Sequence, residues 1–335
     1  MSTESTTTAL VTGGGGFVGR ALVKRLLGMG MAVRSFARGD YPALREMGAE
    51  TARGDLADPH AVKAAAAGCD VIFHVAAKAG AWGSVESFYK PNVTGTSTVL
   101  AACREHGIRK LVYTSTPSVA TGRRAIEGAD ESVGYAEQFD SPYGETKAIA
   151  ERMVLAANGD DLATVALRPR LIWGPGDTQI FPRIVERAQR GTPIKIGTPP
   201  ILIDTTYIDN CVDAHILAYQ KLDIGAACAG KAYFISNGDP RDVGEIIDRM
   251  CAVAGVDAPA QRIGRGAALT AAGLIEMTWR LLRRDGEPPL TRMVVLGLST
   301  PNYFDISAAR KELGYEPKVG IEEGFERLAA WYQAQ

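Results

Sequence analysis

Tyr143 and Lys147 stand at the two ends of the pentapeptide YGETK, directly after Ser141-Pro142. Proline suits the first position of a helix, so a helix that begins there would carry the phenol and the ammonium on one face. A free phenol, with a pKa of about 10, is a poor acid at neutral pH, and a neighbouring ammonium favours its deprotonated form. We therefore expect Lys147 to lower the pKa of Tyr143, so that the phenol can protonate a carbonyl oxygen as hydride reaches the carbon.

Two adjacent hydroxyl groups, Ser115 and Thr116, follow the apolar run KLVYT. This run is typical of a buried parallel strand, and ligands bind at the carboxyl ends of such strands in open α/β sheets. A hydroxyl at that place could orient the carbonyl oxygen and stabilise the charge that develops on it. The pattern alone leaves both residues open for this role.

A glycine-rich turn lies in ALVTGGGGFVGRALVKRLL, between an expected strand and an expected helix. Glycines in such a turn allow a tight bend, a close approach of the backbone to a pyrophosphate, and close packing of the helix on the sheet. The helix N-terminus adds unpaired N–H groups and a positive dipole end. The alternative is a merely flexible turn. We expect a dinucleotide to contact this turn through Gly13, Gly16, Phe17, Val18 and Gly19.

The second expected strand ends in SFARGD, where an NAD-binding protein would usually carry an acidic residue for the ribose hydroxyls. Arg38 stands there instead and suits a 2′-phosphate, whereas Asp40 comes two residues later. This favours NADP(H) over NAD(H), although a surface arginine is the alternative interpretation. Asp55 and Leu56, after the third strand, are placed to meet the adenine, and an exposed turn aspartate is the alternative for Asp55.

The elements that position these residues alternate between short β-branched runs and helical patterns, which predicts a doubly wound parallel sheet of the α/β class. The regular alternation of expected strands and helices ends after WGPGD, and the last third of the chain is expected to be mainly helical. We expect a polar tail (1–8), a dinucleotide-binding Rossmann domain (9–177 with about 205–238), and a smaller, mostly helical substrate lobe (178–204 and 239–335).

Composition excludes several classes of function. The 335 residues carry a formal net charge of −1 and 22% charged residues, which gives no reason to expect nucleic acid or an anionic membrane as a partner. Five cysteines and four histidines are scattered without CxxC spacing, so we expect neither a metal site nor disulfides. The polar start MSTESTTT shows no secretory signal, and the expectation is a cytoplasmic protein.

Four motifs in the same order resemble the extended short-chain dehydrogenase/reductase family: TGxxGxxG, YTSTPSV, YxxxK and LRPRLIWGPGD. The resemblance covers the chain from about residue 8. It implies that Tyr143 is the catalytic acid/base, that Lys147 also holds the nicotinamide ribose, and that Thr116 is the active-site hydroxyl, with Ser115 as the alternative. It further implies that Asn92, in NVTGT, supports the site, and that cofactor contacts come from Ala76, Ala77, Lys78, Pro169 and Ile172.

Further segments, among them AAKAGAWG, DTTYIDN, KAYFISNG and GEPPLTR, resemble the 3β-hydroxysteroid dehydrogenase-like branch. Within it they are similar to reductases of bacterial olefin biosynthesis. That resemblance implies reduction of a 2-alkyl-3-ketoalkanoic acid to the 2-alkyl-3-hydroxyalkanoic acid by NADPH. It implies a β-lactone synthetase and a β-lactone decarboxylase as partners, and a homodimer formed through helices near 86–107 and 141–158.

The substrate side offers several candidates and alternatives. A carboxylate would need a cation, and Lys78, Arg170 and Arg292 are candidates. Trp82 could line the pocket or only pack, and the apolar segment 267–282 could be a lid, an ordinary core helix, or a contact with a membrane or partner. Alternative functions are a 3β-hydroxysteroid or sterol dehydrogenase, a sugar-nucleotide epimerase or dehydratase, and a non-catalytic NADP(H)-binding scaffold.

Overall fold

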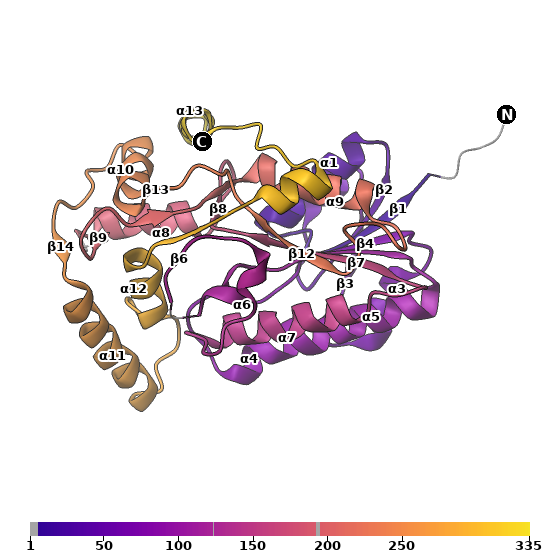
Figure 1. Ribbon diagram of the computed structural model, residues 1–335, viewed down its shortest axis with the longest axis horizontal. Helices are drawn as coiled ribbons and strands as arrows, with labels where there is room; N and C mark the ends of the chain where they lie inside the picture. The colour runs from indigo at the N-terminus through magenta and orange to yellow at the C-terminus, as the bar shows by residue number, and fades with distance from the viewer. Residues whose placement is uncertain (1–5, 123, 192–194) are drawn as a thin grey trace.

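The centre of the molecule is a seven-stranded parallel sheet in the order β12-β7-β5-β4-β1-β2-β3 (Figure 1). The computed structural model describes residues 6–122, 124–191 and 195–335, so residues 1–5 of the predicted tail lie outside it. The predicted doubly wound sheet is confirmed. Its strands are β1 (Thr8–Thr12), β2 (Ala32–Ala37), β3 (Glu50–Arg53), β4 (Val71–His74), β5 (Lys110–Thr114), β7 (Ala163–Pro169) and β12 (Lys231–Ile235).

Helices cover both faces of this sheet (Figure 1). Alternate residues of each strand point to opposite faces, so Leu10 and Ile72 enter one core cluster while Val11 and Phe73 enter the other. Strands buried on both sides must be apolar throughout, which explains their continuous apolar runs. One face carries α3 (Pro59–Ala66), α5 (Gly95–His106) and α7 (Pro142–Ala156), and the other carries α1 (Phe17–Gly28) and α9 (Ile208–Lys221).

The order of the strands reverses between β1 and β4. From β1 the chain adds β2 and β3 on one side, then returns to build β4, β5 and β7 on the other. The connections on the two sides therefore diverge at the carboxyl ends of β1 and β4. Open α/β sheets bind ligands in the crevice that such a reversal leaves.

The long helix expected near 86–107 is divided into three parts. It comprises α4 (Val85–Tyr89), one π-helical turn (Lys90–Thr94) and α5. Pro91 lies inside the π turn, where it lacks the N–H of a regular helix and its ring would clash with the carbonyl one turn earlier. Such π turns occur frequently at functional sites, and this one contains Asn92.

The remaining chain forms the second lobe and several short connections. Its small sheet has the order β13-β10-β15-β6, so β6, from the middle of the first predicted domain, crosses into this lobe. Among the described residues, no helix has the length and hydropathy needed to span a bilayer. The other helices and strands are α2 (Pro42–Glu46), α6 (Ser118–Thr121), β6 (Ile126–Ala129), β8 (Ile172–Trp173), α8 (Ile180–Gln189), β9 (Lys195–Ile196), β10 (Leu202–Ile203), β11 (Thr206–Tyr207), β13 (Arg241–Asp242), α10 (Val243–Val253), β14 (Arg262–Ile263), α11 (Arg265–Leu281), α12 (Arg292–Ser299), β15 (Asn302–Phe304) and α13 (Ile321–Gln333).

Candidate active site

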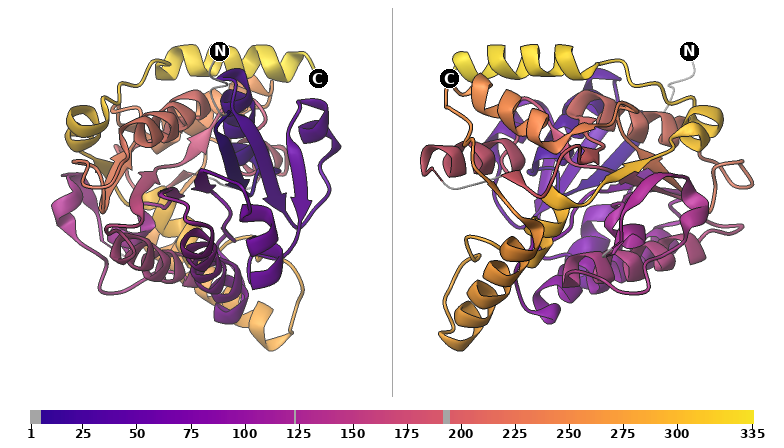
Figure 2. Two further views of the ribbon diagram at one scale, coloured as in Figure 1. Left: turned by 90° about the vertical axis from the view of Figure 1, so that its right-hand side faces the viewer. Right: turned by 60° about the vertical axis from the view of Figure 1, so that its left-hand side comes forward.

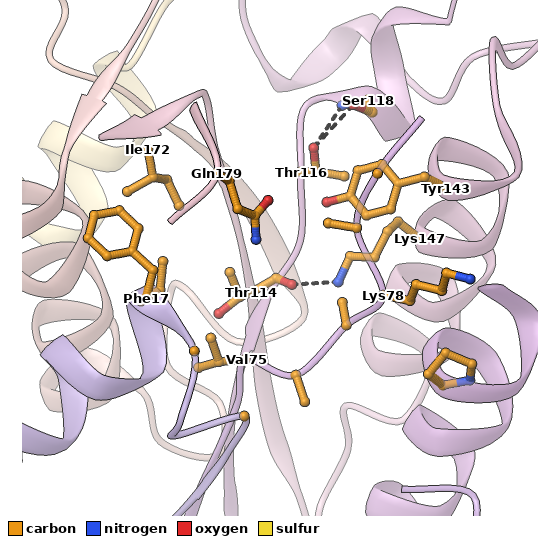
Figure 3. A pocket seen from close by; sticks show the side chains of 18 of the residues that line it. Phe17, Val75, Lys78, Thr114, Thr116, Ser118, Tyr143, Lys147, Ile172 and Gln179 are labelled. Atoms are coloured by element: carbon orange, nitrogen blue, oxygen red, sulfur yellow. Dashed lines mark hydrogen bonds between the residues drawn. The ribbon is translucent and has the colours of Figure 1, made fainter. Parts of the chain in front are cut away.

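A cavity of about 1160 Å³ opens at the carboxyl ends of the central strands (Figure 3). Its walls come from the glycine-rich turn, from the loops after β2 to β5, from α7, and from α8, α10 and α12 of the second lobe. Small-molecule sites usually enclose about 300–1000 Å³. This cavity is large enough to be shared by a cofactor and a second ligand.

The glycine-rich turn brings the start of α1 to the cavity. Gly13 has a φ of 74°, and a Cβ there would lie 2.8 Å from the Cα of Ala76. At Gly19 a Cβ would lie 2.1 Å from the carbonyl oxygen of Gly13, so only glycine lets α1 pack against the turn. The predicted residues of the turn all line the cavity: Gly13, Gly16, Phe17, Val18 and Gly19. They form a backbone cradle that fits a pyrophosphate.

Arg38 directly follows β2, is exposed, and lines the cavity together with Tyr41. Asp40 is not among the lining residues. Its carboxylate pairs with Arg45, and that contact lowers its pKa. The carboxylate nearest in sequence is therefore engaged elsewhere, and the end of β2 offers the cavity a cation.

Asp55 and Leu56 also line the cavity, after β3. The Asp55 carboxylate accepts a 3.0 Å hydrogen bond from the N–H of Ala57 and lies 3.2 Å from the ammonium of Lys90. The Ala57 N–H, more than any other contact, keeps the pKa of Asp55 low. The carboxylate is thus fixed and charged at the wall expected to meet the adenine.

Thr116 and Tyr143 meet at the centre of the cavity (Figure 3). Pro142 occupies the start of α7, as the sequence predicts, and places Tyr143 in the first turn. The Thr116 hydroxyl lies close enough to the phenol to lower its pKa, and it lies 3.2 Å from the hydroxyl of Ser118. Ser115 also lines the cavity, but its Oγ is buried and finds no hydrogen-bond partner among the described residues. The geometry favours Thr116 as the hydroxyl that acts with Tyr143.

Lys147 lies one turn along α7 and is buried. Its ammonium donates a 2.6 Å hydrogen bond to the carbonyl of Thr114 and lies 4.1 Å from the ring centroid of Tyr113. Burial lowers the pKa of Lys147 to about 7.

The predicted acidification of Tyr143 by Lys147 is not found at this site. Burial raises the pKa of Tyr143, and the hydroxyl of Thr116, rather than Lys147, opposes the rise. The physical reason is that the Lys147 ammonium is directed to a backbone carbonyl and is itself only partly charged near neutral pH. The phenol is therefore held in its protonated form, which is the form that can donate a proton.

Asn92 ties the loop after β4 to α7. Its side-chain oxygen accepts a 2.7 Å hydrogen bond from the N–H of Lys78, and its amide donates to the carbonyl of Lys78 at 3.1 Å and to Thr146 at 3.0 Å. Ala76, Ala77 and Lys78 line the cavity in this loop. The Lys78 ammonium is directed away from Tyr143, donating to Ser87 at 2.8 Å (Figure 3).

The second lobe supplies an apolar wall and several polar side chains. Beside this lobe, Pro169 at the end of β7, Arg170 and Ile172 in β8 also line the cavity. Burial lowers the pKa of Arg170 to about 10, and its Nε has no hydrogen-bond partner within the described parts of the chain. The apolar wall comes from Ile184 of α8, Val243 and Ile247 of α10, and Met293, Val294 and Leu298 of α12.

The sequence interpretation missed three polar residues of this wall: Gln179, Arg183 and Arg187. They recur every four residues, the spacing of one helix face, and that periodicity was the available signal. Figure 3 shows the Gln179 amide pointing into the cavity. Both arginines also reach the segment between α11 and α12, because Arg183 pairs with Glu287 at 2.9 Å and Arg187 donates to a backbone carbonyl there at 3.0 Å.

Two predicted substrate residues, Trp82 and Arg292, are not among the residues that line the cavity. The Trp82 ring lies 5.1 Å from the guanidinium of Arg280, so it packs against α11. The backbone N–H of Arg292 donates to Glu276 at 2.8 Å and its Nε lies 3.9 Å from the same carboxylate. A helix N-terminus beside a carboxylate explains this placement.

No group of histidines, cysteines and carboxylates in the described parts of the chain could hold a metal ion. All five cysteines are buried thiols without a disulfide. The polar groups that the fold does bring together at the centre of the cavity are hydroxyls and an ammonium.

Comparison with known proteins agrees with this geometry. The profile of the 3-beta hydroxysteroid dehydrogenase/isomerase family matches residues 10–262. A 2-alkyl-3-oxoalkanoate reductase of Stenotrophomonas maltophilia (strain K279a) is 53% identical over 324 residues, covering 96% of this chain and 98% of that protein. A 3-beta-hydroxysteroid dehydrogenase of Mycolicibacterium neoaurum is 34% identical over 334 residues, covering 96% and 90%.

Among solved structures, the UDP-glucose 4-epimerase of Thermus thermophilus in complex with NAD matches with a TM-score of 0.73 and 24% identity. The match covers 98% of this chain and 99% of that one. At this identity the likeness concerns the fold alone.

Proposed function

This chain belongs to the 3-beta hydroxysteroid dehydrogenase/isomerase family, and we propose that it reduces 2-alkyl-3-ketoalkanoic acids to 2-alkyl-3-hydroxyalkanoic acids with NADPH. That it is an NAD(P)-dependent oxidoreductase follows from the family. The proposed substrate rests on the higher identity to the alkanoate reductase, 53%, than to the steroid dehydrogenase, 34%. The observation that carries the proposal is the Thr116–Tyr143 pair, which faces a cavity with an apolar far wall.

The residues divide the reaction among them. A bound nicotinamide supplies the hydride. Thr116 holds the ketone oxygen through a hydrogen bond, and Tyr143, whose raised pKa keeps the phenol protonated, donates the proton that completes the alcohol. Lys147 lies one turn behind on α7, and its hydrogen bond to the carbonyl of Thr114 holds that helix against the end of β5, which leads to Thr116.

Arg170 is our candidate for the residue that holds the substrate carboxylate. Of the three predicted cations, Lys78 donates a hydrogen bond to Ser87, and Arg292 does not line the cavity. Arg170 lines it, next to Pro169, with a buried Nε that lacks a hydrogen-bond partner among the described residues. The carboxylate of a 3-keto acid lies only two bonds from the ketone carbon, so its anchor must adjoin the reacting group. The two alkyl chains would lie along the wall from α8, α10 and α12.

The preference for NADPH is proposed from Arg38. A guanidinium at the end of β2 would pair with the 2′-phosphate, and the nearby Asp40 is occupied by Arg45. Arg38→Ala should weaken NADPH binding about tenfold to a hundredfold and leave NADH binding within about threefold. Fluorescence titration of both cofactors measures this. Equal weakening of both would contradict the assignment of Arg38 to the phosphate.

The function itself is best tested in the oxidative direction, because 3-keto acids decarboxylate on standing. Purified protein receives a synthetic 2-alkyl-3-hydroxyalkanoic acid with NADP⁺ or NAD⁺, and nicotinamide absorbance is followed. A 3β-hydroxysteroid and a UDP-sugar serve as parallel substrates. We expect turnover of the hydroxy acid with NADP⁺. Turnover of the steroid alone would reject the proposed substrate while keeping the catalytic residues.

We further propose that the protein acts in olefin biosynthesis in the cytoplasm. There it would work with a β-lactone synthetase and a β-lactone decarboxylase, and as a homodimer through α5 and α7. These proposals rest on the resemblance of the chain to such reductases. Light scattering of the purified protein tests the dimer, and co-purification with the two enzymes tests the assembly.

A further inference from the structure

Helix α11 has apolar or buried side chains on two opposite sides. Ala268, Ala272 and Glu276 recur every four residues, are buried, and face α12 and its flanking segment. Leu274, Met277 and Leu281 have the spacing of the opposite side of the helix. These three side chains are exposed by 56%, 52% and 75%. One side of the helix is therefore packed and the other is bare, and Figure 2 shows α11 projecting from the body of the molecule.

A second bare apolar segment lies beside the end of this helix. Val85 and Tyr89, one turn apart on α4, are exposed by 56% and 45%. The contact between Trp82 and Arg280 joins the loop before α4 to the last turn of α11. In Figures 1 and 2, α4 and the far end of α11 lie along the same edge of the molecule. Of the nine large hydrophobic residues that are exposed in the described parts of the chain, six belong to these two segments, when Leu282 at 58% is included.

The charge at this edge is positive, although the whole chain carries −1. Arg280, Arg283 and Arg284 are exposed at or just after the end of α11. The acidic residues nearby are fewer than the arginines: Glu276 contacts Arg292 and Glu287 pairs with Arg183, which leaves Asp285 and, on α4, Glu86 as exposed carboxylates. Arginines next to exposed leucines, with tryptophans at their edge, are the composition of helices that lie in the interface of a membrane.

We propose that the bare side of α11, with α4 and the arginines after α11, is a docking surface for an anionic lipid bilayer. The occupant follows from the charge. A second copy placed symmetrically on this face would bring its arginines against those of the first or, with the two helices antiparallel, against the exposed Arg262 and Arg265 at the start of α11. A bilayer accepts leucine and methionine side chains and attracts each arginine to its headgroups.

This surface adjoins the site of the proposed reaction. α11 packs on α12, and Met293, Val294 and Leu298 of α12 line the cavity. Docking would therefore place the apolar wall of the cavity close to the lipid in which alkyl-chain substrates dissolve. The docking itself is independent of the proposed function, since it can be measured without any substrate.

The test is sedimentation of the full chain with vesicles of phosphatidylcholine alone or mixed with phosphatidylglycerol. We expect binding to the mixed vesicles that weakens as salt is raised. Replacing Leu274, Met277 and Leu281 by serine should reduce the vesicle-bound fraction at least about tenfold. Replacing Arg283 and Arg284 by glutamine should abolish the preference for the anionic vesicles.

Matched controls distinguish a loss of docking from a loss of folding and from nonspecific hydrophobic binding to vesicles. Met29→Ser with Met47→Ser removes two residues that are exposed by 41% and 40% far from α11, and should leave binding unchanged. Every variant must keep the melting temperature and the NADPH affinity of the native protein. A blue shift of the emission of Trp82 and Trp279 on adding vesicles reports docking without any substitution.

Three results would overturn the proposal. The native protein could remain in the supernatant with anionic vesicles at low salt. Binding could survive the triple serine substitution. The native chain could form larger species without lipid that the triple substitution abolishes, in which case the surface is an interface between copies.

Discussion

The two sides of the cavity are built in different ways. The nucleotide side (the glycine-rich turn, the loops after β2 to β5, and α7) is made of strand ends and helix starts, whose backbone and buried polar groups hold one another in place. The substrate side (α8, α10 and α12) is made of side chains on helices that come from three distant parts of the sequence. Chemistry is therefore fixed on the first side by local geometry, and selectivity is left to the second. The following predictions test that division.

Tyr143→Phe should have the largest effect. Removing the proton donor should lower kcat by about 10³-fold or more, whereas NADPH affinity should stay within about threefold because the ring remains. Steady-state kinetics and fluorescence titration measure the two quantities. Tyr219→Phe, which changes a tyrosine packed on Phe73, is the control. Substantial activity in the Tyr143 variant would show that the proton donor is another group and that catalysis does not depend on the nucleotide side.

The buried ammonium of Lys147 makes stability depend on pH. Its pKa falls from 10.5 in the usual environment to about 7, so between these values the unfolded chain binds a proton that the folded chain does not. The free energy of unfolding, relative to Lys147→Met, should therefore rise with pH across that window, by up to about 5 kcal/mol, and be flat below it. Urea unfolding at several pH values measures this. A difference that is independent of pH would show that Lys147 stays charged in the fold.

Thr116→Val and Ser115→Ala distinguish the two candidate hydroxyls. Because the Thr116 hydroxyl acts on the pKa of Tyr143 and the Ser115 hydroxyl does not, we expect kcat to fall about 10²-fold for the first variant and less than about threefold for the second. Steady-state rates with saturating cofactor measure both. The reverse order would move the active hydroxyl to Ser115.

Arg170→Gln tests the connection between β7 and β8, which adjoins the substrate side, and should have the smallest effect. We expect KM for the hydroxy acid to rise roughly tenfold to a hundredfold with a smaller change in kcat. Turnover of an ester of the same acid should hardly change, since it lacks the carboxylate. Arg292→Gln is the matched control, because Arg292 lies outside the cavity. Equal losses for acid and ester would indicate a structural role for Arg170.

The sequence predicted the two sides unequally, for a physical reason. The glycines, Tyr143 and Lys147 are required by backbone geometry and by one helical turn, so their spacing shows in the chain. Trp82 and Arg292 do not line the cavity, because they contact α11, a helix whose place no local pattern reveals; for Trp82 this is the packing alternative that the sequence left open. Gln179 and the arginines of α8 were missed because a polar helix face has the same sequence pattern whether it faces solvent or a cavity.

The direction in which the pKa of Tyr143 shifts could not be predicted from the sequence either. The spacing correctly placed Lys147 one turn away, but the direction of its ammonium depends on the carbonyl of Thr114, which only the fold brings near. Similarly, one helix near 86–107 was the simplest interpretation, and the π turn that points Asn92 inward depends on its contacts with Lys78 and Thr146.

The path of the chain between Thr116 and Tyr143 links catalysis to the second lobe. Midway along it, β6 leaves the nucleotide-binding layer and pairs with β15, so that Ile126 lies opposite Asn302. Thr116 and Tyr143 are thus the two ends of one segment whose middle is paired with a strand of the second lobe. A nucleotide-binding half cut free of that lobe would retain TGxxGxxG, YTSTPSV, YxxxK and LRPRLIWGPGD, yet would lose the pairing of β6 with β15 that anchors the segment between the hydroxyl and the phenol.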